Sequence, residues 1–407
     1  MFGKNNIADY FTEFDFDIRK SKNGRWIDQK CTPDVLSTIA DCIINFIAEN
    51  PFVIEFTKND IWFSQYTKDF IGDIFNKPDI DHRLSQNEYD KLFSQPLEML
   101  ASANVLHKEK KGRGNFYSIR SEELLEYISL REKNALAFII IYCKKVIWDS
   151  DIWPLFERFF DVQTKDAYLE LKDGYENFMI ANTKINGCTE VRRIFTKVLN
   201  PLAYDRRKRG TAGGYISDSI ITYAELMYNR VNFRDINASK PKDMTRNEWN
   251  NQRSSKINKQ YYLYQSEKAK RFLRRFNDDI NSGRSELMDE YSQGNATQIH
   301  HIFSAHQYPE ISMCLENLIA LTPTQHLTMA HPDNNTHRID LVYQEKLLKA
   351  KVGSIKRNLS DEKVESIYQF SKFIEVLSNG FDADYEVGEY DFCTIMQIIA
   401  DYYMESG

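Results

Sequence analysis

One stretch of 35 residues, Thr297–His331, constrains the fold of this chain more than any other. It holds five of the eight histidines, at positions 300, 301, 306, 326 and 331. Apolar and polar residues alternate through Gln298–Phe303, which predicts a strand, and the apolar run Leu318–Leu321 predicts a second one. Thr324 then stands where it could cap a helix that begins at Gln325. The segment therefore predicts a compact strand–strand–helix unit rich in histidine, the commonest metal ligand.

Four residues of this segment have the layout of a one-metal phosphodiesterase. His300 and His301 are adjacent, Asn317 follows sixteen residues after His301, and His326 comes nine residues later. This β–β–α order resembles the HNH, or ββα-metal, nuclease family. The resemblance implies that His301 is the general base that takes a proton from the attacking water. It implies that Asn317 holds the loop and orients the His301 imidazole. It also implies that His300 and His326 are ligands of one divalent cation, with Mg²⁺ or Mn²⁺ favoured.

The chemistry of these residue types agrees with that assignment. An imidazole with a pKa of about 6.5 can accept a proton from water near neutral pH, and a bound cation neutralises charge that builds on a phosphate. The chain departs from the commoner family pattern because it has no CxxC pair, and Met329 and Ala330 stand where a second helix ligand often falls. His331, one step further, is an alternative ligand. Two imidazoles are softer than a carboxylate and an amide, so Zn²⁺ or Ni²⁺ is an alternative metal.

The first quarter of the chain predicts two helices followed by a hairpin. The helices are expected over Thr32–Glu49 and Ser85–Asn104, and VLHKEKKGRGNFYSI (105–119) predicts a hairpin with a glycine-containing turn. This order resembles a winged helix, whose second helix usually enters the DNA major groove. The resemblance implies phosphate contacts from the hairpin tip, at Lys110, Lys111 and Arg113. A winged fold used for protein contacts, or a plain surface hairpin, is the alternative.

The middle of the chain is basic, although the whole chain carries a net charge of −6. Val191–Arg275 holds 20 Lys and Arg against 7 Asp and Glu, a local balance of +13. This balance favours a phosphate-binding surface, and the alternative is a solvated face of ordinary helices. A glycine turn beside cations can approach a phosphate backbone, which here points to Arg206, Arg207, Lys208 and Arg209. Arg246 and Asn247 lie in a segment rich in residue types that read base edges.

These patterns predict a mainly helical, multidomain chain of the α+β class. The expected parts are a winged-helix-like domain over 1–125, a helical and basic recognition or connector region over 126–285, and a nuclease domain with a helical tail over 286–407. No apolar run is long enough to span a membrane, and the N-terminus lacks a secretion signal. The six cysteines are scattered singly, which favours a reduced, cytoplasmic protein.

Several segments together narrow the kind of nuclease. RRIFTKVLNPLAY, ELMYNR, DMTRNEW and the histidine segment are similar to the HNH class of type II restriction endonucleases, particularly those that cut beside their recognition site. This resemblance implies sequence-specific cleavage of double-stranded DNA, a cognate DNA methyltransferase as genetic partner, and a homodimer or sequential nicking. One alternative is a non-catalytic DNA-binding regulator with a structural zinc site, built for instance on His300, His306 and Cys314. Another is a weakly specific HNH nuclease that acts on foreign or modified DNA.

Overall fold

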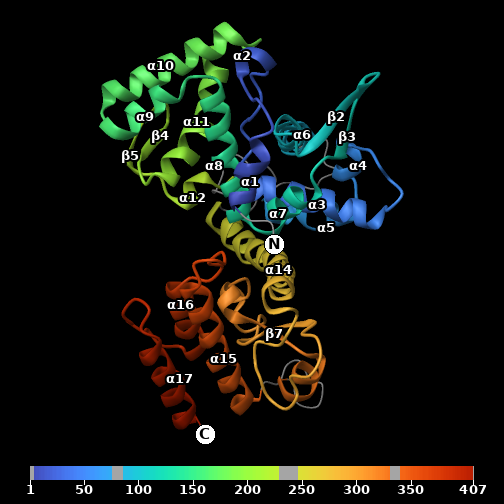
Figure 1. Cartoon of the computed structure of the whole chain (residues 1–407), viewed down its shortest axis with the longest axis vertical. Coiled ribbons are helices and arrows are strands. Elements are labelled where there is room, and N and C mark those ends of the chain that lie inside the picture. The colour runs from blue at the N-terminus through green and yellow to red at the C-terminus, as the bar shows by residue number, and fades with distance from the viewer. Residues whose placement is uncertain (1–3, 76–85, 229–245, 331–339, 407) are drawn as a thin grey trace. The chain divides into compact units, whose positions relative to one another are not determined.

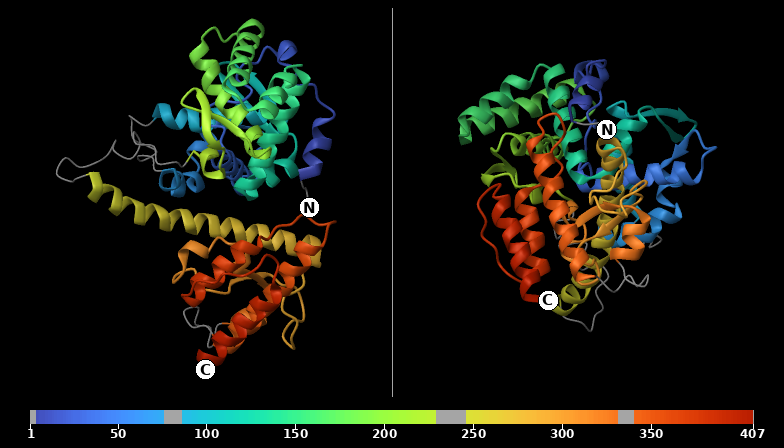
Figure 2. Two further views of the ribbon diagram at one scale, coloured as in Figure 1. Left: turned by 90° about the vertical axis from the view of Figure 1, so that its left-hand side faces the viewer. Right: turned by 60° about the horizontal axis from the view of Figure 1, so that its bottom comes forward.

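The computed structural model describes residues 4–75, 86–228, 246–330 and 340–406, and the side chains of 246–260 lie outside this description. The fold is mainly helical with small antiparallel sheets, so the prediction of the α+β class is confirmed. The chain divides into two compact units, Phe2–Arg253 and Ser254–Gly407, which are called the N-terminal and C-terminal units below (Figure 1). The division falls inside one long helix, α14 (Arg246–Asn281), which is continuous in each view of Figure 2.

The N-terminal unit begins with helices that pack against a small sheet. The sheet has the order β1-β3-β2 and is antiparallel throughout. Its hairpin turns at Gly112, whose φ of +61° suits glycine. The predicted helices and hairpin are confirmed within the described residues. The elements are α1 (Lys4–Phe11), α2 (Ile18–Ser21), α3 (Pro33–Glu49), β1 (Phe56–Thr57), α4 (Lys58–Trp62), α5 (Gln65–Ile74), α6 (Gln86–Ser102), β2 (Leu106–Lys111) and β3 (Gly114–Ile119).

Helix α3 illustrates how the sequence produces this packing. Pro33 occupies its first turn, where the missing N–H costs no hydrogen bond. Its apolar residues recur at helical spacing, and Val35, Leu36 and Ile39 are fully buried. The helix packs against α7 (Glu122–Leu130) and α8 (Glu132–Asp149), which follow the hairpin in the chain. The first expected domain and the start of the expected connector therefore share one core.

Between Glu122 and Leu226 the N-terminal unit consists of helices and a second hairpin. The glycine turn expected beside Arg206–Arg209 is the tip of this hairpin, with φ values of +59° at Gly213 and +88° at Gly214. These values are accessible to glycine at no steric cost, which explains the pair of glycines. The elements are α7 (Glu122–Leu130), α8 (Glu132–Asp149), α9 (Trp153–Val162), α10 (Lys165–Asn182), α11 (Cys188–Asp205), β4 (Arg209–Ala212), β5 (Tyr215–Ile220) and α12 (Tyr223–Leu226).

The C-terminal unit contains a two-stranded sheet and several helices. After α14 come β6 (Gln298–His301), the short 3-10 turns η1 (Pro309–Ile311) and η2 (Leu315–Asn317), and β7 (Leu318–Leu321). A π-helical segment, η3 (Gln325–Ala330), follows at once. The helical tail is α15 (Leu341–Ser360), α16 (Phe370–Phe381) and α17 (Phe392–Ser406). Helix α15 packs on α17, and α16 packs on η2, so the predicted tail covers the histidine-bearing segment.

Within the described parts of the chain, no helix combines the length and apolar character needed to cross a lipid bilayer. The apolar run 135–143 forms part of α8, whose residues Ala135, Phe138, Ile139 and Cys143 are fully buried.

Candidate active site

The frame of the candidate site is the antiparallel pair β6 and β7. In its register His300 lies opposite Ile319 and His301 lies opposite Leu318. All four residues of β7 are buried, so this strand is part of the core of the unit. The predicted strand–strand–helix order is present, although the last element is a π-helical turn and not a regular α-helix. Because side chains alternate across a strand, the two adjacent histidines are directed to different neighbours.

The structure brings His300 and His326 together. Their ring centroids are 5.2 Å apart with the planes inclined by 73°. His300 is buried, and the Nε2 atom of His300 and the Nδ1 atom of His326 are both shielded from solvent. Two imidazoles at this separation can each offer a ring nitrogen to one ion between them. The sequence prediction that these two residues act as a pair is therefore consistent with their placement.

His301 has a separate set of contacts. Its Nε2 atom lies 3.0 Å from the backbone carbonyl oxygen of Ser312 and 3.0 Å from the hydroxyl of Ser266 on α14. A carbonyl oxygen only accepts hydrogen bonds, so Nε2 carries the proton and Nδ1 carries the lone pair of the neutral ring. Burial lowers the pKa of His301 to about 4, and the positive charge of Lys270 acts in the same direction. The imidazole is therefore neutral near physiological pH, as a proton acceptor must be.

Asn317 holds the loop between the two strands. It is fully buried, and its Oδ1 accepts a hydrogen bond of 2.8 Å from the Phe303 backbone N–H. Its Nδ2 donates to the carbonyl oxygens of Phe303, at 3.0 Å, and Ile311, at 3.3 Å. These bonds connect the start of the loop to the residue just before Ser312. Asn317 thus supports the carbonyl that orients His301, without contacting the imidazole in these bonds.

The cap of the final helical segment is Thr322, and the prediction of Thr324 is wrong. The Thr322 Oγ1 accepts from the Gln325 N–H at 3.2 Å, while the Gln325 Oε1 accepts from the Thr322 N–H at 3.1 Å. This reciprocal pair is a capping box, which requires a Gln or Glu three residues after the Thr. Thr324 has no such residue at position 327, which is a leucine.

Gln325 also anchors the residue next to it, His326. The buried Gln325 side chain accepts from the Ser285 hydroxyl at 2.7 Å and donates to the Leu287 carbonyl at 2.9 Å and the Asp289 carboxylate at 2.8 Å. Each of these partners lies more than thirty residues earlier in the chain. The position of His326 is therefore set by a hydrogen-bond network that includes the loop before β6.

The described residues contain no group of three or more His, Cys, Asp or Glu side chains arranged to hold a metal ion. His300, His306 and Cys314, the zinc set considered from the sequence, therefore do not come together. His306 is exposed, whereas Cys314 is buried. His331, the alternative ligand, and His337 lie outside the described residues.

The predicted DNA-contacting residues lie in the N-terminal unit and at the start of α14. Lys110, Lys111 and Arg113 are exposed at the tip of the first hairpin. Lys111 forms an ion pair of 2.6 Å with Glu55, which reduces the charge that it offers to a phosphate. The side chains of Arg246 and Asn247, in the first turn of α14, lie outside the described part of the structure.

In the cationic cluster Arg206–Arg209, some side chains are used in packing and others are exposed. The Arg206 guanidinium lies 5.0 Å from the ring centre of Trp153, so part of its surface is used in a cation–π contact. Arg207 is exposed, and Lys208 is partly exposed. The Arg209 Nε donates to the carbonyl of Ser217 at 2.6 Å, within its own hairpin. Arg207 and Lys208 are therefore the members best placed to meet a phosphate.

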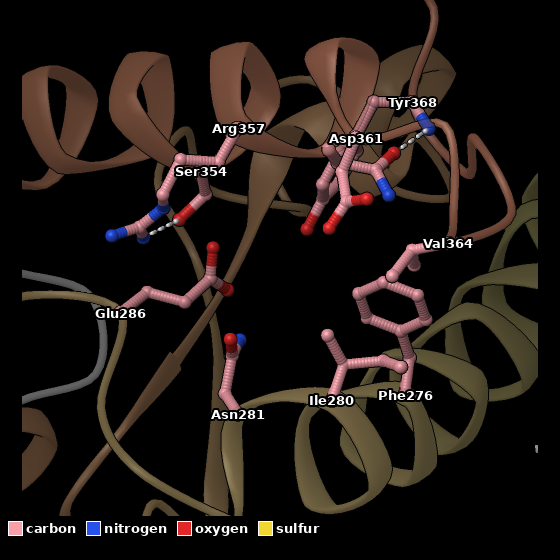
Figure 3. Close-up of a pocket in the computed structure, with 10 residues that line it drawn as sticks. Phe276, Ile280, Asn281, Glu286, Ser354, Arg357, Asp361, Val364 and Tyr368 are labelled. Carbon is pink, nitrogen blue, oxygen red and sulfur yellow. Dashed lines mark hydrogen bonds between the residues drawn. The ribbon is translucent and has the colours of Figure 1, made fainter.

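A buried ion pair between Glu286 and Lys351 supports β7, and the sequence did not predict it. The Glu286 N–H donates to the Ala320 carbonyl at 3.0 Å, and its carboxylate accepts from the Ala320 N–H at 2.9 Å. Lys351 on α15 lies 3.1 Å from the same carboxylate and donates to the Tyr368 hydroxyl at 2.7 Å. Glu286 and Arg357 both line a cavity of about 250 Å³, and Figure 3 shows the Glu286 side chain between those of Arg357 and Asn281.

The residues that support the site carried different signals in the sequence. The Thr322–Gln325 capping box has a recognisable spacing, so that pattern could have been found. Ser266, Ser312 and Glu286 had none, because each acts through a contact between segments distant in the chain. No protein-family model, no curated protein and no solved structure matches this chain.

Proposed function

We propose that this protein is a site-specific endonuclease of the HNH type that hydrolyses phosphodiester bonds of double-stranded DNA. The observation that carries the proposal is the state of His301, a neutral imidazole whose Nε2–H is held by the Ser312 carbonyl. Its Nδ1 is then the atom that accepts a proton from water. The water oxygen attacks the phosphorus, the 3′ oxygen leaves, and the product carries a 5′-phosphate.

His300 and His326 are the residues that would hold a divalent cation. A bound cation would supply Lewis-acid stabilisation of the phosphate and of the leaving oxygen. The two imidazoles would hold such an ion through their adjacent rings. Mg²⁺ or Mn²⁺ is the proposed cofactor, and Zn²⁺ or Ni²⁺ is the alternative because imidazole is a softer ligand than oxygen.

The N-terminal unit is proposed to recognise the DNA. The order of helices before the hairpin and the β1-β3-β2 sheet resemble a winged helix, which favours α6 as the helix for the major groove. Lys110 and Arg113 at the hairpin tip, and Arg207 and Lys208 beyond α11, would contact phosphates. A cognate methyltransferase and a cytoplasmic location belong to the same proposal, as expected for a restriction enzyme.

The test is cleavage of supercoiled plasmid by the purified full-length protein in Mg²⁺, Mn²⁺, Zn²⁺ or Ni²⁺. We expect discrete fragments from the wild type and a loss of at least about 100-fold in rate for His301→Ala, since general-base catalysis contributes ~10²- to 10⁴-fold. His306→Ala is the matched control, because His306 lies in the same loop but is exposed. This variant should cut like the wild type.

Three other outcomes identify the alternatives. A His301→Ala variant that cuts as fast as the wild type would contradict the assignment of the base. A smear in place of discrete fragments supports the weakly specific nuclease. Tightly held zinc without cleavage in any metal supports a DNA-binding regulator, although His300, His306 and Cys314 do not form its site.

A further inference from the structure

Ser266 lies on α14, 35 residues before His301 in the chain, and its hydroxyl reaches the imidazole at 3.0 Å. Ser266 and Ser312 are both buried, so this part of His301 is closed to bulk water. The Nε2 atom thus meets two oxygen atoms, one from a backbone carbonyl and one from a helix side chain. No part of the proposed mechanism so far requires the hydroxyl.

The two oxygens differ in what they permit. The Ser312 carbonyl can only accept, so it requires a proton on Nε2. With that proton in place the Ser266 oxygen is a second acceptor for the same N–H, and its own hydrogen is directed elsewhere. Both bonds persist when Nδ1 takes a proton from water and the ring becomes positively charged. They would then be hydrogen bonds to a charged group, which are stronger than neutral ones.

We propose that Ser266 is a positioning residue for the general base, whose hydroxyl fixes the His301 ring with Nδ1 as the proton acceptor and stabilises the imidazolium formed during the reaction. This inference rests on the proposed nuclease function of the same site. With the Ser312 carbonyl as its single acceptor, the His301 Nε2–H would leave the ring free to rotate about that hydrogen bond. The Ser266 hydroxyl, a second acceptor from α14, restricts this rotation. The buried surroundings make the second acceptor important, because water is not available to replace it.

The kinetic test compares Ser266→Ala with Ser266→Thr in single-turnover cleavage of a plasmid by the full-length protein. Loss of a hydrogen bond to a charged group should lower the rate constant of Ser266→Ala by about 10- to 100-fold. The dissociation constant for DNA, measured without cleavage in Ca²⁺, should not change. Ser266→Thr keeps the hydroxyl and should recover most of the rate. Ser354→Ala, which removes another buried serine hydroxyl of the same unit, is the matched control.

A second measurement needs neither DNA nor metal. In protein labelled with ¹⁵N-histidine, the His301 Nε2–H signal is assigned by its absence from His301→Gln. We expect that signal to be protected from exchange in the wild type and in Ser266→Thr. In Ser266→Ala it should shift and exchange faster with water, because one acceptor is missing. Thermal unfolding of each variant checks that the fold is retained.

The outcomes separate this inference from the nuclease proposal. If the wild type cleaves and Ser266→Ala has the same rate and the same Nε2–H signal, the role of Ser266 is refuted. Equal losses in Ser266→Ala and Ser266→Thr also refute it, because the hydroxyl is then not the group that matters. If the wild type cleaves no DNA in any metal, the nuclease proposal fails. The Nε2–H signal then decides whether Ser266 holds the His301 ring.

Discussion

At the scale of single residues, the adjacent histidines 300 and 301 show how one strand can separate two tasks. The His300 ring lies beside His326, whereas the His301 ring is bonded to Ser312 and Ser266. Adjacent side chains along a strand meet different neighbours, although the proposed mechanism needs both residues to act on one phosphate. Two adjacent positions of β6 thus give different surroundings to the proposed metal ligand and the proposed general base.

The depressed pKa of His301 leads to a prediction about stability in acid. Its pKa is lowered to about 4, whereas an unfolded chain has a histidine pKa of about 6.5. Below pH 6.5 the His301 side chain therefore binds a proton in the unfolded state but not in the folded state. The free energy of unfolding falls as the pH drops towards 4. The full contribution is about 3 kcal/mol.

The measurement is urea unfolding of the metal-free protein at pH values from 7.5 to 4, for the wild type and His301→Gln. Glutamine cannot titrate, so the free energy of unfolding of His301→Gln should fall less steeply than that of the wild type between pH 6.5 and 4. The carboxylates titrate in both proteins and cancel in the comparison. Parallel curves would show that His301 is protonated as easily in the folded protein as in the unfolded chain.

At the scale of elements, β7 is braced by a buried ion pair, Glu286 and Lys351, that lies outside the histidine segment Thr297–His331. The side chains of Lys351 and Glu286 are 0% and 2% exposed, and Glu286 bonds both backbone groups of Ala320. Burial lowers the pKa of Lys351, because it disfavours the charged form. Removal of one partner should therefore be more harmful than removal of both, since a lone buried charge has no compensation.

We expect Lys351→Met to lower the free energy of unfolding by about 3–5 kcal/mol, as found when buried ion pairs are broken. The double variant Lys351→Met/Glu286→Gln should recover a large part of that loss. The matched control is Lys349→Met, which breaks a more exposed pair with Glu345 on the same helix and should change stability by less than about 1 kcal/mol. Chemical denaturation measures the free energy of unfolding of these three variants and of the wild type. A double variant less stable than Lys351→Met would contradict the argument.

The elements of the site could be predicted from the sequence to the extent that local patterns determine them. Alternation identified β6, an apolar run identified β7, and glycines identified the first hairpin turn and a second turn that proves to be the tip of another hairpin. The helix cap was misplaced because two threonines compete, and only Thr322 has a glutamine three residues later. Ser266 and Glu286 were missed for another reason. Their partners, His301 and Ala320, lie 35 and 34 residues away in the chain, where no local periodicity applies.

At the scale of the whole molecule, the basic middle of the chain lies across the boundary between the two units. Val191–Arg275 includes α11, the second hairpin and most of α14. The predicted phosphate contacts at Arg206–Arg209 thus belong to the same stretch that supplies Ser266 to His301, whereas those at Lys110, Lys111 and Arg113 do not. The part of the chain that the structure describes contains one set of the residues proposed to cut DNA, with His300 beside His326 and His301 bonded to Ser312. One set can break one strand of a duplex at a time.

Cleavage of both strands then requires either two copies of the protein or two successive events, and we expect a homodimer. The test uses two tagged forms, wild type and His301→Ala, that are co-expressed and purified on both tags so that only mixed dimers remain. Mixed dimers should convert supercoiled plasmid to nicked circles and stop, because one subunit lacks the base. A mixed preparation with His306→Ala should give linear DNA. If the His301→Ala mixture also gives linear DNA through a nicked intermediate, one active subunit cuts both strands in turn, and the dimer is not needed for double-strand cleavage.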